Sequence, residues 1–178
     1  MKHSSILLFL FLGMLSLITS CKKDEYKAPV SNTVSMSGRW WIQFWIDDDG
    51  DGSFNAANDL LYYDYADIGS FGLVTSNDAA NSPDSLWVND IEGIWPFKFK
   101  SGVNTSTNLF SPATYNNLAI DGESVTVHEA KILPGAGTTL SGSKVDSIYF
   151  DLEFSDDPGY HYFFSGIKYT GHVEDEYH

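Results

Sequence analysis

The feature that most constrains the fold of this chain is a two-residue alternation of apolar and polar side chains within residues 145–154. Successive side chains of a β-strand point to opposite faces, so an alternating segment buries one face and exposes the other. This segment is therefore predicted to be a half-buried strand. Its two faces would carry Ile148, Phe150, Leu152 and Phe154 on the inside, and Tyr149, Asp151 and Glu153 on the outside.

Short strand-like runs and tight turns continue through the chain from Gly38 onward. Asp121-Gly122 and the Ser-Asp-Asp-Pro-Gly run at residues 155–159 are typical of hairpin turns. No stretch of the sequence keeps a 3.6-residue apolar period for long, which argues against extended helices. The candidate strands are Arg39–Ile46, Leu60–Ala66, Ser70–Ser76, Leu86–Asp90, Ile94–Lys100, Leu118–Ile120, Ser124–Leu133, Val145–Phe154 and Tyr160–Tyr169.

About eight or nine short strands in one small domain predict an all-β fold, either a barrel or a sandwich. We favour a small antiparallel up-and-down barrel of about eight strands, because closure leaves no unpaired strand edge. The chain contains five Trp, ten Tyr and twelve Phe residues. Aromatic side chains can fill the interior of a packed barrel or line a ligand cavity at its mouth, and the sequence leaves both arrangements open.

The first twenty residues are typical of a secretory signal peptide. Lys2 and His3 precede an uncharged run at residues 4–20 that is largely apolar and ends in small residues. A transmembrane anchor would need about 20 predominantly apolar residues, and this run is shorter. Ile18-Thr19-Ser20-Cys21 resembles the lipobox of bacterial lipoproteins, in which the cysteine is acylated. Cys21 is the only cysteine of the chain, so no internal disulfide competes for its thiol. We expect a signal peptide at residues 1–20 and a lipid on Cys21.

The residues that follow the cysteine are expected to link the lipid to the folded domain. The composition of residues 21–37 predicts a lipidated cysteine followed by a flexible tether, with the barrel domain at residues 38–178. Lys22-Lys23-Asp24-Glu25 resembles the export tag of Bacteroides-type surface lipoproteins, and a plain hydrophilic tether has the same composition. The expected location is the outer membrane, with the protein lipid-anchored and exposed at the cell surface.

The charge of the chain restricts its partners. It has 24 acidic and ten basic residues, which give a formal net charge of −14. Loss of the signal peptide removes Lys2 and makes the charge more negative. A chain this acidic is repelled by nucleic acids and by anionic lipid surfaces. We therefore exclude nucleic acid as a partner and expect the protein to reach the membrane through its lipid anchor.

An acidic, glycine-containing segment at residues 47–59 is the strongest candidate site. Carboxylates at every second residue followed by Gly52 match the start of an EF-hand calcium loop, whose alternate positions supply oxygen ligands. The twelfth position holds Asn58 in place of the bidentate Glu, so Ca²⁺ binding is expected to be weak. A solvated acidic turn without a metal is the alternative. The candidate ligands are Asp47, Asp49, Asp51, Ser53, Asn55 and Asp59.

Catalytic motifs are weak in this sequence. It has no Gly-x-Ser-x-Gly nucleophile elbow. The Ser-x-x-Lys pairs of the predicted barrel domain, Ser141/Lys144 and Ser165/Lys168, fall in predicted loops or strands, where no helical turn brings the two side chains together. His128 and His161 lie in predicted strands, where an imidazole is usually paired with a neighbour or exposed. No catalytic residue is therefore predicted.

Short motifs spread over the mature chain are similar to those of a known family. They are Gly38-Arg39-Trp40-Trp41, Trp87-Val88-Asn89-Asp90, Lys98-Phe99-Lys100, the run 146–159, Ser165-Gly166 and the run 170–176. Together they resemble the Bacteroides-type lipoprotein family labelled "lipid-binding putative hydrolase". This resemblance implies a barrel similar to the calycins and lipocalins. The chain departs from the family pattern at Lys168-Tyr169, where two arginines are usual, and in its acidic first hairpin.

Three functions follow from these observations. The leading expectation is a non-catalytic barrel on an outer-membrane lipoprotein that binds a lipid or other small apolar ligand. The first alternative, which the family label implies, is a hydrolase of unknown substrate. The second is a structural or interaction protein that belongs to a surface complex.

Overall fold

The computed structural model describes residues 30–68, 72–91 and 95–177. Residues 31–178 form one folded unit. The predicted signal peptide, Cys21 and residues 22–29 of the predicted tether lie outside the described residues. No helix within the described ranges is both long and apolar enough to cross a membrane.

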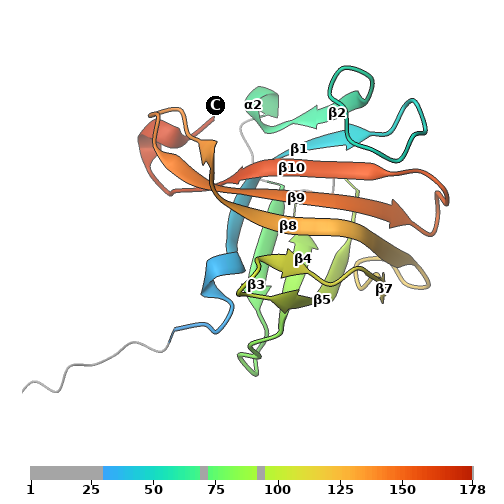
Figure 1. Ribbon diagram of the computed structural model, residues 1–178, viewed down its shortest axis with the longest axis horizontal. Coiled ribbons are helices and arrows are strands. Elements are labelled where there is room, and N and C mark those ends of the chain that lie inside the picture. Colours follow the sequence, from blue (N-terminus) through green and yellow to red (C-terminus); the bar gives the residue numbers. More distant parts are fainter. Residues whose placement is uncertain (1–29, 69–71, 92–94, 178) are drawn as a thin grey trace, which may run out of the picture. The chain divides into compact units, whose positions relative to one another are not determined.

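The fold is a closed antiparallel β-barrel, as the sequence predicts (Figure 1). Within the described residues, ten strands form one sheet, and eight of them close a ring in the order β1-β3-β4-β5-β6-β8-β9-β10, with β10 paired to β1. The ring follows chain order, so it is an up-and-down barrel. The strands are β1 (Gly38–Ile46), β2 (Leu60–Asp64), β3 (Leu73–Asn77), β4 (Ser85–Asp90), β5 (Lys98–Asn104), β6 (Leu109–Phe110), β7 (Ala113–Asn116), β8 (Ser124–Thr138), β9 (Lys144–Phe154) and β10 (Tyr162–Lys168).

The sheet forks at two long strands, β1 and β8. One edge of β1 pairs with β3 over Gly38–Trp40 and with β2 over Gln43–Ile46. One edge of β8 similarly pairs with β7 over Ser124–Val127 and with β6 at Lys131. The strands β2 and β7 are therefore side branches of the ring, and the connection between β1 and β2 is the acidic segment at residues 47–59.

The barrel interior is filled by side chains. Inward-facing residues of the ring strands form one continuous buried cluster. The Trp40 indole donates to the Thr75 hydroxyl at 2.9 Å, and that hydroxyl donates to the Met36 carbonyl at 2.7 Å, so the polar groups inside are paired. Of the two arrangements the sequence left open, the structure has the packed interior. Its largest fully buried members are Trp40, Phe44, Phe97, Phe99, Phe150, Phe154, Tyr162 and Phe164.

The folded unit begins earlier than the predicted boundary at Gly38. Residues 31–37 belong to it, and the 3-10 helix η2 (Val34–Met36) places Met36 in the core. Asn32 forms two hydrogen bonds with Asn81, from its backbone N–H to Oδ1 at 2.8 Å and from its Nδ2 to the backbone carbonyl at 2.6 Å. The last residues of the predicted tether are therefore packed on the barrel.

Three predicted strands need correction. The strand expected at Ile94–Lys100 begins only at Lys98 and continues to Asn104, because Pro96 lacks the N–H that a strand ladder needs. Leu118–Ile120 is a turn, because the Asn117 side chain accepts from the Lys98 and Ala119 amides and so fixes the backbone in place of a ladder. The strand expected at Leu60–Ala66 ends at Asp64, where the short helix α2 (Tyr65–Ile68) begins. The short strands β6 and β7 were not predicted, because segments of two and four residues show too little alternation.

Candidate functional site

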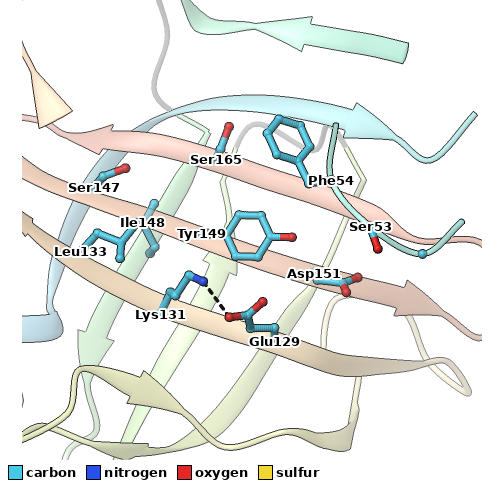
Figure 2. A pocket seen from close by; sticks show the side chains of 11 residues that line it. Ser53, Phe54, Glu129, Lys131, Leu133, Ser147, Ile148, Tyr149, Asp151 and Ser165 are labelled. Carbon is cyan, nitrogen blue, oxygen red and sulfur yellow. Dashed lines mark hydrogen bonds and ion pairs between the residues drawn. The ribbon is translucent and has the colours of Figure 1, made fainter. Parts of the chain in front are cut away.

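A groove lies on the outer wall of the barrel, beneath the segment that joins β1 to β2 (Figure 2). We call this groove the outer groove, and the segment at residues 47–59 the acidic loop. The outer groove has a volume of about 470 Å³. Its walls combine apolar, hydroxyl and charged side chains. The lining residues are Gly52, Ser53, Phe54, Glu129, Lys131, Leu133, Ser147, Ile148, Tyr149, Asp151 and Ser165.

The floor of the outer groove follows from the register of β8, β9 and β10, whose rows of side chains continue onto β1. Directly paired residues of antiparallel strands share a face, so outward side chains of β8, β9, β10 and β1 line up in rows across the sheet. Tyr149 lies in the central row. The rows are Leu133-Ser147-Ile167-Trp41, Lys131-Tyr149-Ser165-Gln43 and Glu129-Asp151-Phe163-Trp45.

Phe54 of the acidic loop covers one end of this floor. Its ring lies edge-on to Trp45 and Phe163, with centroids 5.4 and 5.6 Å apart. Phe163 is fully buried although it faces outward, which shows how closely the loop is packed on the wall. The indole Nε1 of Trp45 is buried beneath the loop without a hydrogen-bond partner among the described residues.

The central row of the floor brings a cation beside an aromatic ring. Lys131 Nζ lies 5.2 Å from the centroid of the Tyr149 ring and donates to Glu129 Oε1 at 2.6 Å. Burial, together with the nearby carboxylates of Asp151 and Glu129, raises the pKa of the Tyr149 hydroxyl above its ordinary value of 10. The Tyr149 phenol therefore stays neutral at physiological pH. Lys131 is the basic residue among those that line the outer groove.

The acidic loop gathers three of the predicted calcium ligands. Asp47, Asp49 and Asp59 each offer a carboxylate oxygen within 4.8 Å of the others. Asp47 and Asp59 are buried, and Asp49 is exposed. Burial raises the pKa of Asp59, and the negative charges of the neighbouring aspartates raise it further.

Two glycines let the loop wrap around Asp47. Its carboxylate accepts from the Gly50 amide at 2.8 Å and from the Gly52 amide at 2.9 Å. Both glycines have φ near +71°, a left-handed conformation that residues with a Cβ rarely adopt. The Gly-Asp-Gly sequence therefore allows the backbone to donate inward to one buried carboxylate.

Asp51, Ser53 and Asn55 of the predicted ligand set are not among the three gathered carboxylates. Asp51 Oδ1 accepts from the Ser53 amide at 2.7 Å, and Asn55 Oδ1 accepts from the Ala57 amide at 3.1 Å. These side chains shape local turns of the loop. The loop closes a β-hairpin in which Asp59 lies across from Asp47, so the gathered carboxylates come from both ends of the loop.

No motif of the sequence predicts the aspartate–histidine pair that lies beside the acidic loop. Asp151 Oδ1 lies 2.7 Å from His161 Nδ1, and the His161 ring stacks on the His128 ring at 4.4 Å between centroids. His128 Nε2 in turn lies 3.0 Å from Glu153 Oε2. Burial raises the pKa of Asp151, although the hydrogen bond from His161 opposes this shift. The turn at residues 155–159 was the available signal, since it sets the β9–β10 register that brings this pair together.

The surroundings of His161 limit its chemistry. A Cβ at Gly52 would lie 3.5 Å from His161 Nε2, so the acidic loop packs against the nitrogen that a general base would use. Ser165 lines the outer groove four residues further along the strand, which separates the two Cα atoms by about 13 Å. The hydrogen bonds of the described residues include none between His161 and a serine.

Comparison with protein families gives one finding. A family model described as "Lipid-binding putative hydrolase" matches residues 25–173. No curated protein matches the chain.

Proposed function

The chain belongs to the lipid-binding putative hydrolase family, and from this membership we propose that it binds a lipid or a similar amphipathic molecule in the outer groove. The observation that carries the proposal is the make-up of that groove. Apolar side chains of Phe54, Leu133 and Tyr149 share it with the Lys131 ammonium, three serines and two carboxylates. An acyl chain matches the apolar set, and a polar head group that hydrogen-bonds to the hydroxyl and charged side chains matches the second set.

The filled interior is what directs the proposal to the outer wall. A lipid inside the barrel would have to displace fully buried aromatic side chains such as Phe44 and Phe150. Emptying a packed core in this way costs several kcal/mol for each large side chain displaced. The outer groove needs no such rearrangement, and its volume of about 470 Å³ lies within the range of about 300–1,000 Å³ that is usual for small-molecule sites.

We further propose that the mature protein is held at the outer membrane by a lipid on Cys21 and faces the cell surface. The support is in the sequence: an apolar signal run, the lipobox-like Ile18-Thr19-Ser20-Cys21, and the Lys22-Lys23-Asp24-Glu25 segment. A lipid-binding domain at a membrane surface would meet its ligand there.

The groove proposal predicts that Leu133→Asp weakens binding of a fluorescent fatty acid such as cis-parinaric acid. Leu133 is 40% exposed, so the substitution leaves the core intact. It places a carboxylate where the acyl chain would lie, and we expect the Kd to rise at least about tenfold. The measurement is a saturation titration followed by fluorescence transfer from tryptophan. Leu140→Asp is the matched control, because Leu140 is 57% exposed and does not line the outer groove.

Equal loss of affinity in the two variants would show that added negative charge, and not the groove, weakens binding. Unchanged affinity in both would place the ligand elsewhere. If the wild-type protein binds no fatty acid saturably and hydrolyses nothing, the interaction-protein alternative becomes the best account of the chain.

The aspartate–histidine pair favours one second candidate, a hydrolase. Asp151 Oδ1 lies 2.7 Å from His161 Nδ1 and orients the imidazole, as a carboxylate orients the general base of a hydrolytic triad. The acidic loop packs against His161 Nε2, which argues against a hydrolase. We therefore expect no turnover of p-nitrophenyl esters above background. General-base assistance raises a reaction rate by about 10²–10⁴-fold, so the activity of a working dyad would be measurable in purified protein. Turnover that His161→Gln removes and His172→Gln retains would establish the hydrolase instead.

A further inference from the structure

We propose that Asp47, Asp49 and Asp59 bind one calcium ion, which fixes the acidic loop against the outer wall of the barrel. The site is built from both ends of the loop: Asp47 directly follows β1, and Asp59 directly precedes β2. A cation held between them would clamp the base of the hairpin. Asp49 would complete the carboxylate set from the turn between them.

The spacing of the three carboxylates suits calcium. Calcium binds oxygen ligands at about 2.3–2.6 Å, so two ligands on opposite sides of one ion lie up to about 5.2 Å apart. The oxygens of Asp47, Asp49 and Asp59 all lie within 4.8 Å of one another. Magnesium demands near-ideal octahedral geometry and keeps several of its waters, so a set of three loop carboxylates suits it less readily than calcium. The remaining calcium ligands would be loop carbonyls and water.

Asp59 gives a second, independent observation. The residue is only 8% exposed, and its Oδ1 is buried with no hydrogen-bond partner among the described residues. Burying an unpaired carboxylate oxygen is costly, because it loses its hydration without a replacement. A cation in the cluster would supply the missing partner. An acidic turn that needed only solvent would instead leave this oxygen at the surface.

The other two carboxylates are already oriented for such an ion. The Gly50 and Gly52 amides hold Asp47, and the Asn58 side-chain amide holds Asp49 Oδ2 at 3.0 Å. A carboxylate oxygen has more than one lone pair, so it can accept an N–H and still bind a metal. Three negative charges this close repel one another, and a divalent cation would neutralise most of that charge.

A calcium clamp would also control the outer groove, a consequence that rests on the function proposed above. The same loop carries Gly52, Ser53 and Phe54 to the groove. Fixing its two ends would hold the Phe54 ring on Trp45 and Phe163. Calcium should therefore tighten lipid binding, whereas calcium binding itself does not depend on any lipid.

The test is calorimetric titration of the purified soluble domain with calcium chloride, alongside melting curves in calcium and in chelator. The wild type should bind one ion per chain with a Kd of about 10⁻⁴–10⁻³ M, as extracellular calcium modules do. Its Tm should rise with calcium and then saturate. Asp59→Asn should raise the Kd at least about tenfold, since it replaces a charged carboxylate ligand with a neutral amide oxygen. It should leave the Tm in chelator equal or higher, because a buried charge is gone.

Asp51→Asn is the matched control, because it removes one negative charge from the same loop outside the gathered carboxylates. We expect it to change the Kd much less than Asp59→Asn. Hydrogen exchange at the Gly50 and Gly52 amides should slow in calcium in the wild type and in Asp51→Asn, but not in Asp59→Asn. These readouts involve no lipid, so they succeed or fail independently of the groove proposal.

Three results would overturn the site. The first is identical wild-type melting curves in chelator and in millimolar calcium. The second is an equal loss of calcium affinity in Asp51→Asn and Asp59→Asn, which would mean diffuse attraction to an acidic loop. The third is a magnesium response as strong as the calcium response at the same concentration, which would indicate general screening.

Discussion

Replacing Gly166 with alanine is expected to destabilise the protein by at least about 3 kcal/mol, because the new methyl group has no room. A Cβ at this position would lie 2.1 Å from the Trp41 carbonyl oxygen and 2.6 Å from Ile42 Cδ1. The first of these atoms is backbone, so β1 and β10 would have to separate where they close the barrel. In a domain of this size, the Tm should fall by about 6–12 °C, measured by circular dichroism.

Gly38→Ala is the matched control for this prediction. Gly38 lies in β1, on the same pair of strands that Gly166 of β10 helps to close. The nearest atom to its added Cβ is Lys168 Cε at 3.0 Å, the flexible part of a long side chain. The lysine can move aside, so the Tm should change little. If the Tm of Gly166→Ala equals the Tm of Gly38→Ala and of the wild type, β10 does not pack on β1 this closely.

Replacing Cys21 with alanine should remove the protein from the membrane fraction almost completely. Each buried CH₂ of an acyl chain contributes about 0.8 kcal/mol, and several chains on one cysteine give an anchor that a single chain does not. Without the thiol, no chain can be attached. Fractionation of expressing cells, followed by mass spectrometry of the mature N-terminus, measures both the location and the modification.

Lys27→Ala is the control for the anchor, since it changes a residue after the cysteine and leaves the lipobox-like sequence intact. We expect Lys27→Ala to stay with the membrane. A wild-type protein whose residue 21 carries no acyl group would contradict the anchor, and so would membrane retention of Cys21→Ala.

The barrel was predictable because its longest regular strands repeat with a period of two residues. The alternation at residues 145–154 placed Ile148 and Phe150 inside, where the structure has them. The turn at residues 155–159 marked the following hairpin. The short strands β6 and β7 carry little alternation, and Leu118–Ile120 looked apolar enough to be a strand although side-chain hydrogen bonds make it a turn.

The candidate site was less predictable, because it depends on contacts between distant parts of the chain. The acidic pattern marks residues 47–59 as a metal candidate, but its spacing favours Asp51, at a ligand position, over Asp59, which lies one residue past the closing position. Only the hairpin separates them, since it buries Asp59 beside Asp47 and turns Asp51 toward the Ser53 amide. The outer groove combines three strands with a loop, and no local pattern records such a surface.

The forks at β1 and β8 have a consequence for how proteins with this barrel can diversify. The acidic loop and β2 lie outside the closed ring of strands. The strand pairs β1–β3 and β1–β10 complete the ring without them. Insertions in this hairpin can accumulate at little cost to the scaffold, because surface loops tolerate changes of length. Family members could therefore keep one conserved framework and exchange metal dependence and ligand preference by replacing a single hairpin.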